Sequence, residues 1–168
     1  MSWNTTFNIA TNKNEITSLL GPYANGDSIR YSDPEGPGQT GATLQLLKVG
    51  KPIGQFFSLR YAGKDQNGVS TFYKRDGTTT TSPFIGTDYF YVGDAQPKFL
   101  MGWSNSVRYG NWDLNVFLRG VFGNKIFNAT RADLSYVVAG AQNNLLNSAS
   151  DDKINDNRNS YYSTRYIE

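Results

Sequence analysis

Two stretches of alternating apolar residues, 99–109 and 112–122, constrain the fold more than any other part of the sequence. They flank Gly110-Asn111, and glycine at the first central position suits a two-residue type II′ turn, so we expect an antiparallel hairpin. One face then carries these pairs, most of them apolar: Tyr109 with Trp112, Val107 with Leu114, Asn105 with Val116, Trp103 with Leu118, Met101 with Gly120 and Phe99 with Phe122. A shift of one residue would mix the two faces, so the sequence specifies this register.

The opposite face of the predicted hairpin is mostly polar. Beside the turn it places Arg108 opposite Asp113, which predicts a cross-strand ion pair. Farther from the turn it places Gly102 opposite Arg119. If the hairpin belongs to a barrel, Asp113 and Arg119 would line its lumen. There they would either contact an internal plug domain or, as we favour, be solvated charges.

The arms of the hairpin are long, at 11 residues each. A tilted transmembrane β-strand needs about 9–11 residues, whereas soluble strands are commonly about 5–6 residues long. Tyr109 and Trp112 mark one end of the apolar face, and Phe99 and Phe122 mark the other. Aromatic girdles at both interfaces, with short turns on one side and long loops on the other, are typical of outer-membrane barrels.

Alternation alone leaves two interpretations open. In a transmembrane barrel the apolar face would contact lipid. In a soluble β-sandwich, such as a carbohydrate-binding or adhesin module, the same face would pack against a second sheet.

Composition narrows the functional classes. The chain has 168 residues, 38% of them hydrophobic and 14% aromatic, and no window of 18 consecutive apolar residues predicts a transmembrane helix. A net charge of +2 without a basic run argues against nucleic-acid binding. The absence of Cys and His removes thiolate sites and the commonest general base. We therefore predict a protein that is not an enzyme.

The rest of the sequence predicts further strands and long loops. Strands are expected at about residues 3–12 and 52–61, and loops at 19–48, 64–98 and 124–164. Within the second loop, a turn at Asn67-Gly68 precedes a short strand, Val69–Tyr73. The first residues lack the basic and apolar regions of a signal peptide, and both ends resemble cuts through a longer chain.

One short helix is predicted after the hairpin, within residues 128–149. Its apolar residues follow helical spacing: Leu134, Val137, Val138, Ala141 and Leu145. Thr130 and Asp133 resemble a capping box at its start, with Asp in place of the preferred Glu. The following residues, 148–163, read as a polar loop with little that could form a core.

Three groups of residues resemble functional sites, but an ordinary structural role is favoured for each. Asp65 and Asn67 are spaced like the start of a calcium loop but lack the further ligands, so a plain turn is favoured. The glycine spacing in 93–97 is wrong for a phosphate loop, and a turn is again favoured. Four tyrosines could stack on sugars, although loop packing is preferred for them: Tyr23, Tyr31, Tyr161 and Tyr162. No catalytic, cofactor-binding or metal-binding residue is predicted, and substrate-contacting residues stay unassigned.

Several runs together resemble the SusC/RagA family of TonB-dependent outer-membrane receptors. They are WNTTFNIATNKNEITSL (3–19), VGKPIGQFF (49–57) and YVGDAQPKFLMGWSNSVRYGNWDLNVFLRGVFGNKIFNATR (91–131), and STRYIE (163–168) resembles the start of the family's next strand. The run FFSLRYAG (56–63) departs from the family pattern, in which another aromatic–glycine pair would follow the first aromatic residue. The resemblance covers nearly the whole chain and points to a late part of the barrel.

The resemblance implies an all-β fold of antiparallel strands from a 22-stranded transmembrane barrel in the outer membrane of a Gram-negative, Bacteroidetes-like bacterium. It implies import of large nutrients, glycans or peptides, with energy from the TonB complex and with a SusD-like surface lipoprotein as partner. The plug and the TonB-contacting segment are absent from residues 1–168, and too few strands are present to close a barrel. Alone, such a fragment transports nothing.

Overall fold

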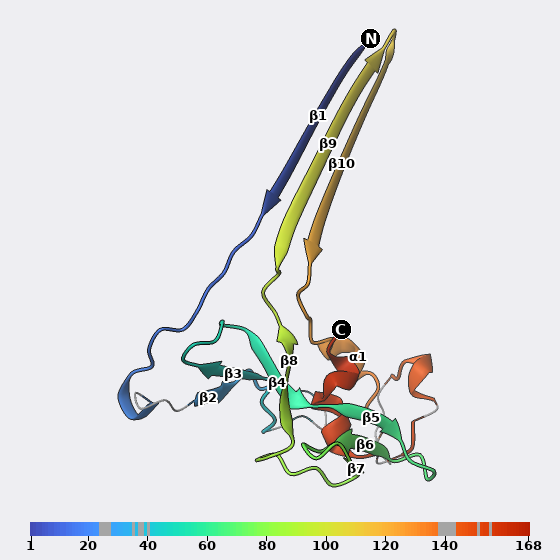
Figure 1. Ribbon diagram of the computed structural model, residues 1–168. Helices are drawn as coiled ribbons and strands as arrows, with labels where there is room; N and C mark the ends of the chain where they lie inside the picture. The colour runs from blue at the N-terminus through green and yellow to red at the C-terminus, as the bar shows by residue number, and fades with distance from the viewer. Residues whose placement is uncertain are drawn as a thin grey trace.

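The computed structural model describes residues 1–23, 28–34, 36, 39, 41–137, 144–150, 152–154 and 156–168. A long three-stranded sheet projects from a group of shorter strands and helical turns (Figure 1). We call the long sheet the ribbon and the rest the body. The N-terminus and the hairpin turn lie together at the far end of the ribbon, and the C-terminus lies beside the body.

The ribbon has the strand order β1-β9-β10 and is antiparallel throughout. Strand β1 spans Ser2–Ala10, β9 spans Phe99–Tyr109 and β10 spans Trp112–Phe122. The β9–β10 register pairs Tyr109 with Trp112 and Phe99 with Phe122, as the sequence predicts. Gly110 has a φ of 57°, which a type II′ turn requires at this position.

The body contains two small antiparallel sheets. One has the order β2-β3-β4-β8 and consists of Ser28–Tyr31, Gln45–Lys48, Gln55–Leu59 and Tyr89–Asp94. The other has the order β5-β6-β7 and consists of Tyr61–Lys64, Ser70–Tyr73 and Thr79–Thr80. The long loops expected at 19–48 and 64–98 are therefore wrong in part, because the first contains β2 and β3 and the second contains β6, β7 and β8.

The strand expected at 52–61 is also wrong in its bounds. The chain enters β4 only at Gln55, because Gly54, two residues after Pro52, takes a positive φ of 86°. The strand then breaks at Arg60, and β5 joins the other sheet. The short strand after the Asn67-Gly68 turn is present as β6.

The helix is shorter than the apolar spacing predicts. Helix α1 spans Ala129–Asp133, and its N-cap is Asn128, whose side chain accepts a hydrogen bond from the Arg131 amide. The capping box expected at Thr130 is therefore wrong, since Thr130 already lies inside the helix. Val137 and Leu145 are not helical, and Val138 and Ala141 fall outside the described residues.

The C-terminal segment forms 3-10 turns rather than the start of a full strand. The segment contains the turns η2 (Asn147–Ala149), η3 (Arg158–Tyr162) and η4 (Thr164–Tyr166). A further 3-10 turn, η1 (Gly21–Tyr23), lies near the N-terminus. Within the described residues the C-terminal segment makes two isolated strand-like bridges, Ile167 with Phe127 and Ser163 with Leu59. The polar loop expected at 148–163 is wrong as well, because Tyr161 and Tyr162 are buried in the body.

Two clusters of buried side chains form the core of the body. The larger one includes Leu44, Leu59, Phe72 and Tyr89, and the smaller one includes Tyr161 and others. Leu59 and Phe72 are fully buried. The body thus has an interior of its own, whereas the ribbon is one sheet thick.

Candidate functional site

The apolar face of the ribbon is uncovered. Trp103, Leu114 and Leu118 are 42%, 60% and 54% exposed, so no second sheet packs on them. The β-sandwich interpretation is therefore wrong. We define the apolar face by these exposed side chains: Trp3, Phe7, Ile9, Trp103, Tyr109, Trp112, Leu114, Val116, Leu118 and Phe122.

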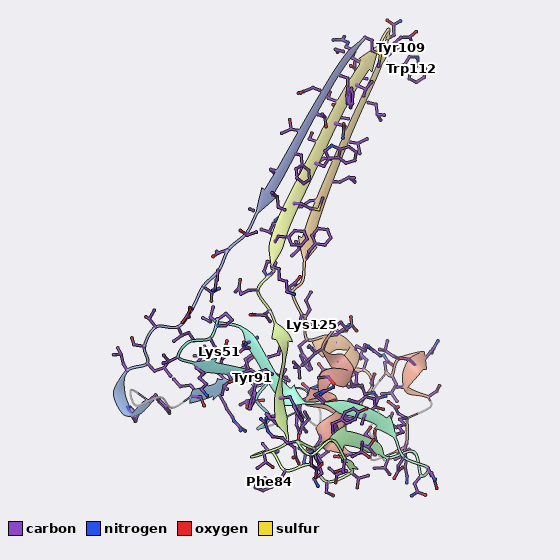
Figure 2. All side chains as sticks on the ribbon, viewed as in Figure 1. Lys51, Phe84, Tyr91, Tyr109, Trp112 and Lys125 are labelled. Atoms are coloured by element: carbon purple, nitrogen blue, oxygen red, sulfur yellow. The ribbon has the colours of Figure 1, made fainter. Side chains whose placement is uncertain are left out.

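The apolar face has the height of a bilayer core. Figure 2 shows Tyr109 and Trp112 at the tip of the ribbon, and the rings of Phe99 and Phe122 stack at 4.8 Å near its base. Strand β9 spans 11 residues between these aromatic pairs. At about 3.3 Å per residue and a tilt of about 40°, such a strand rises roughly 25 Å. This is close to the apolar band of about 25 Å in outer-membrane barrels.

A polar row crosses the apolar face, and two tryptophans satisfy it. Thr5 and Asn105 are paired opposite each other in the register of β1 and β9. The indole Nε1 of Trp3 donates to Asn105 Oδ1 at 3.2 Å, and the indole of Trp103 donates to Thr5 Oγ1 at 2.9 Å. In hydrocarbon an unsatisfied polar group is costly. These reciprocal bonds satisfy one acceptor on each side chain of the row and so lower the free-energy cost of placing it in lipid.

The other face of the ribbon is mostly polar, although it also exposes the apolar side chains of Phe117 and Val121. Arg108 and Asp113 form the expected cross-strand ion pair, with Nε and Oδ1 at 3.5 Å. Both side chains are well exposed, so the pair contributes little to stability. Arg119 is exposed on the same face and makes no ion pair within the described part of the chain. The alternative of a contact to an internal domain remains a prediction for both Asp113 and Arg119.

Charged side chains hold the C-terminal turns to the body. The carboxylate of Asp152 accepts two hydrogen bonds from Arg165 at 2.7 Å and one from Lys64 at 2.5 Å. Asp156 accepts from both the amide and the hydroxyl of Ser70 at 2.8 and 2.6 Å. Burial disfavours the charged guanidinium of Arg165, but the hydrogen bond to Asp152 and nearby charges outweigh it and raise its pKa.

The buried tyrosines of the body are held in the neutral form. Burial is the main cause that raises the pKa of Tyr89 and of Tyr161. Burial likewise raises the pKa of Tyr162 and Tyr166. Their hydroxyl groups therefore stay protonated well above neutral pH.

The other candidate residues have structural roles. Asp65 Oδ1 accepts from the amides of Asn67 and Val69 at 2.9 and 2.8 Å, so it closes a turn. Asp94 in turn accepts from the Gln96 amide at 3.3 Å, and the segment 93–97 is a turn at the end of β8. Within the described residues no cluster of acidic side chains could hold a metal ion.

Of the four candidate tyrosines, two are unavailable to a ligand. Tyr161 and Tyr162 are 0% and 6% exposed and pack in the body, so their loop-packing interpretation holds. Tyr23 is 40% exposed, and Tyr31 is half-buried on β2. Neither makes a contact that identifies a ligand.

Sequence reasoning missed two functional features. The pairing of Trp3 with Asn105 and of Trp103 with Thr5 depends on the neighbouring strand β1, which lies about a hundred residues away in the chain. The only signal for it was a polar pair on an otherwise apolar face. The ion pair of Asp152 with Arg165 could not be predicted, because acidic and basic residues are common in loops and their spacing does not indicate which of them pair.

Comparisons with known proteins agree in the kind of protein that they find. The chain is 29% identical over 161 residues to TonB-dependent receptor P3 of Formosa agariphila, covering 87% of this chain and 15% of that protein. It is 29% identical over 129 residues to TonB-dependent receptor SusC of Bacteroides thetaiotaomicron, covering 75% of this chain and 12% of that protein. The chain thus spans less than a sixth of each relative. No family model matches the sequence.

A solved structure shares the fold. The RagAB peptide importer in its open-open state matches 99% of this chain and 18% of its own chain, with a TM-score of 0.65 and 16% identity. Among the described residues, none of the helices could serve as a transmembrane span. The chain is similar over most of its length to a segment of SusC/RagA-type TonB-dependent receptors, and its antiparallel strands and open ribbon agree with a fragment of such a barrel.

Proposed function

We propose that this chain, as a segment of a SusC/RagA-type receptor, forms part of the barrel wall and the outer loops of an importer in a bacterial outer membrane. The observation that carries the proposal is the uncovered apolar face of the ribbon, bounded by aromatic pairs at both ends. A soluble protein rarely leaves a continuous apolar surface of this kind exposed. Lipid chains would cover it without any further protein.

The shape of the chain supports one orientation in the membrane. Outer-membrane barrels have short turns on the periplasmic side and long loops outside. The turn at Gly110-Asn111 is the shortest possible, and the body lies at the opposite end of the ribbon (Figure 1). In the proposed orientation the turn faces the periplasm, the body faces the medium, and the polar face with Arg119 lines the lumen.

The proposed activity belongs to the whole receptor and is not enzymatic. The relatives are TonB-dependent receptors, and the solved structure is described as a peptide importer. By analogy, the receptor would take up large nutrients, glycans or peptides, with energy supplied through TonB. A SusD-like surface lipoprotein would help to capture the substrate. Residues 1–168 would contribute part of the barrel wall and part of the outer loops to this receptor.

An uptake assay tests the proposal in the producing organism. Cells with the full-length receptor are given fluorescent peptides or oligosaccharides, and uptake is compared with cells that lack TonB and with cells that lack the receptor. We expect uptake to fall to background in both controls for one substrate class. Uptake of both classes that is unchanged without the receptor would contradict the proposal.

A further inference from the structure

Half of the chain's eight lysines lie where the ribbon meets the body: Lys13, Lys51, Lys98 and Lys125. We call these four residues the lysine rim. Lys13 and Lys98 line one pocket at this junction, and Figure 2 shows Lys51 and Lys125 on the side of the body that faces the ribbon. All four side chains are exposed, and none has a carboxylate at ion-pair distance among the residues that the structure describes.

Two lysines of the rim pack their stems on glycines. A Cβ atom at Gly93 would lie 2.5 Å from Cγ of Lys125. A Cβ atom at Gly123 would lie 2.8 Å from both Cγ and Cδ of Lys98. Both glycines also have a positive φ, of 142° and 79°, which other residues rarely adopt. The fold therefore leaves room for these two stems and fixes where each ammonium group begins its reach.

Lys98 and Lys125 lie just beyond the apolar face of the ribbon. Lys98 directly precedes Phe99, and Lys125 comes three residues after Phe122. These two phenylalanines stack on each other at the base of the apolar face. At about 3.3 Å per residue and a tilt of about 40°, the two lysines lie roughly 3–8 Å outside it. The headgroup region of a bilayer is about 5–8 Å thick on each side, so both lysines are at its level.

The charge at this level favours an anionic group as the occupant. Two carboxylates, Glu15 and Asp94, line the same pocket as Lys13 and Lys98. The four lysines still exceed these carboxylates by two positive charges. Lysine buries its stem along apolar surface while its ammonium group stays in water, and basic pockets beside a membrane bind anionic headgroups.

Continuity with the apolar face identifies the source of the anion. The rim follows the last apolar residues of β9 and β10 along the same two stretches of chain. In the proposed orientation, a lipid whose chains cover the apolar face has its headgroup beside the rim. Its phosphate therefore comes within reach of the lysines without any further protein. This favours lipid over an acidic protein or a free anion.

We infer that the lysine rim binds the phosphate groups of negatively charged lipids in the outer leaflet, with Lys98 and Lys125 as its central residues. The inference rests on the proposed function, because it takes the membrane placement of the ribbon from it. It adds the class of lipid that surrounds this part of the barrel and the residues that select that class.

A quenching measurement in vesicles tests the inference. The full-length receptor without other cysteines carries a fluorophore on Ile126→Cys, beside Lys125, where the native side chain is 63% exposed. The vesicles consist of phosphatidylcholine with a minor fraction of nitroxide-labelled lipid, either phosphatidic acid or phosphatidylcholine, with the label near the headgroup end of one chain. The ratio of the two quenching efficiencies reports the preference for the anionic lipid at the rim.

Two double variants supply the matched comparison. Lys98→Gln with Lys125→Gln removes two charges from the rim and keeps most of both stems. Lys74→Gln with Lys153→Gln removes two charges from side chains elsewhere in the body. Glutamine keeps the packing of the stem on its glycine, so the body is expected to fold in both variants.

We expect phosphatidic acid to quench the wild-type receptor at least about threefold more than phosphatidylcholine does, and this ratio to fall as salt is added. The ratio is expected to fall close to one in the Lys98 and Lys125 variant and to stay at the wild-type value in the Lys74 and Lys153 variant. Equal quenching by the two lipids in the wild type, or an unchanged ratio in the Lys98 and Lys125 variant, would overturn the inference.

A second fluorophore separates this inference from the proposed function. It is placed on Leu118→Cys, on the apolar face, and quenched with lipids labelled deep in the chain. Quenching at 118 without a preference at 126 overturns the inference and leaves the membrane placement intact, whereas no quenching at 118 contradicts both.

Inorganic phosphate distinguishes a lipid from a free anion at the rim. It is added at the same ionic strength as a chloride control. We expect the preference for phosphatidic acid to be equal in the two salts. If inorganic phosphate abolishes the preference and chloride does not, the rim is a site for free anions, and the inference is overturned.

Discussion

The ribbon and the body use apolar side chains in opposite ways. In the body, Leu59 and Phe72 are fully buried among other side chains. In the ribbon, Leu114 and Trp112 are 60% and 81% exposed on the apolar face. The body therefore buries its apolar side chains against one another, as a small globular protein does. The ribbon leaves them exposed, and in the proposed membrane the lipid chains would cover them.

The treatment of polar groups differs in the same way. In the body, buried charges are paired within the chain, as Asp152 is with Arg165 and Lys64. On the apolar face of the ribbon, charges are absent, and the polar pair Thr5 and Asn105 is satisfied by indole donors. The comparison teaches that burial in this chain cannot be judged from the chain alone, because lipid is part of the environment of one region.

The largest expected effect is in the body, at the carboxylate of Asp152, whose side chain is 2% exposed. Replacement of Asp152 by Ala removes the nearer of the two carboxylates beside the buried guanidinium of Arg165 and leaves only Asp156, whose Oδ2 lies 3.7 Å from Nη1. Breaking a buried ion pair in this way typically costs about 3–5 kcal/mol. We expect the C-terminal turns to detach, which a rise in hydrogen exchange of the Tyr161 and Tyr166 amides would report. Unchanged exchange in these amides would show that the charges do not hold the turns. The exposed pair of Arg108 and Asp113 provides the control, because Asp113→Ala is expected to change stability by less than about 1 kcal/mol.

The next largest effect separates the two faces of the ribbon. Leu118→Arg places a charge on the apolar face near its middle, where arginine costs about 2–4 kcal/mol in lipid. Asn115→Arg places the same charge on the polar face of the same strand and is expected to be tolerated. Folding of the full-length receptor into lipid vesicles, followed by resistance to unfolding in urea, measures both. Equal stability of the two variants would contradict the assignment of faces.

A smaller effect is expected at the indole bonds. Trp103→Phe leaves the Thr5 hydroxyl without its donor in hydrocarbon, which costs about 1–3 kcal/mol. The double variant Trp103→Phe, Thr5→Val removes both polar groups and is expected to recover most of the loss. Urea unfolding of the vesicle-bound receptor measures the coupling between the two positions. Purely additive losses would mean that the bond at 2.9 Å does not form in the membrane.

Alkaline pH is expected to weaken the body and to spare the ribbon. Burial raises the pKa of Tyr89 and Tyr161, so ionisation is harder in the folded body than in the unfolded chain. The two neutral tyrosines therefore contribute fully to the free energy of unfolding below the unfolded pKa of about 10. That contribution decreases as pH rises above this value, by about 1.4 kcal/mol per pH unit for each tyrosine. Tyrosinate absorbance with circular dichroism would follow this transition. Ionisation of these tyrosines at pH 10 without any loss of body structure would contradict their burial.

The ribbon could be predicted from the sequence because its information is local. Alternation and the Gly110-Asn111 turn fix the bounds and register of β9 and β10, and both agree with the structure. The body could not be predicted in the same way. Its strands β2, β3 and β8 are short, and β4 pairs with β8 across the intervening residues 60–88. Its core also includes Tyr161 and Tyr162. These residues follow a mostly polar stretch of sequence, which gives no sign that they are buried.

The candidate sites followed the same division. Turn chemistry at Asp65 and in residues 93–97 is local, and the structure bears it out. The helix expected within 128–149 is wrong in its length, because α1 ends at Asp133 and neither Leu134 nor Val137 belongs to it. Contacts that join distant segments, such as Asp156 with Ser70, leave no periodic signal in either segment.

The most direct test of lipid contact is a scan of single cysteines along β10 in the full-length receptor without other cysteines. The chain itself contains none. An environment-sensitive fluorophore is attached at each position in 112–119, and quenching by nitroxides on the lipid chains is recorded in vesicles. The account predicts quenching with a period of two residues, strong at 112, 114, 116 and 118 and weak between them. Uniform quenching, or strong quenching at 113, 115, 117 and 119 instead, would contradict the contact between the apolar face and lipid.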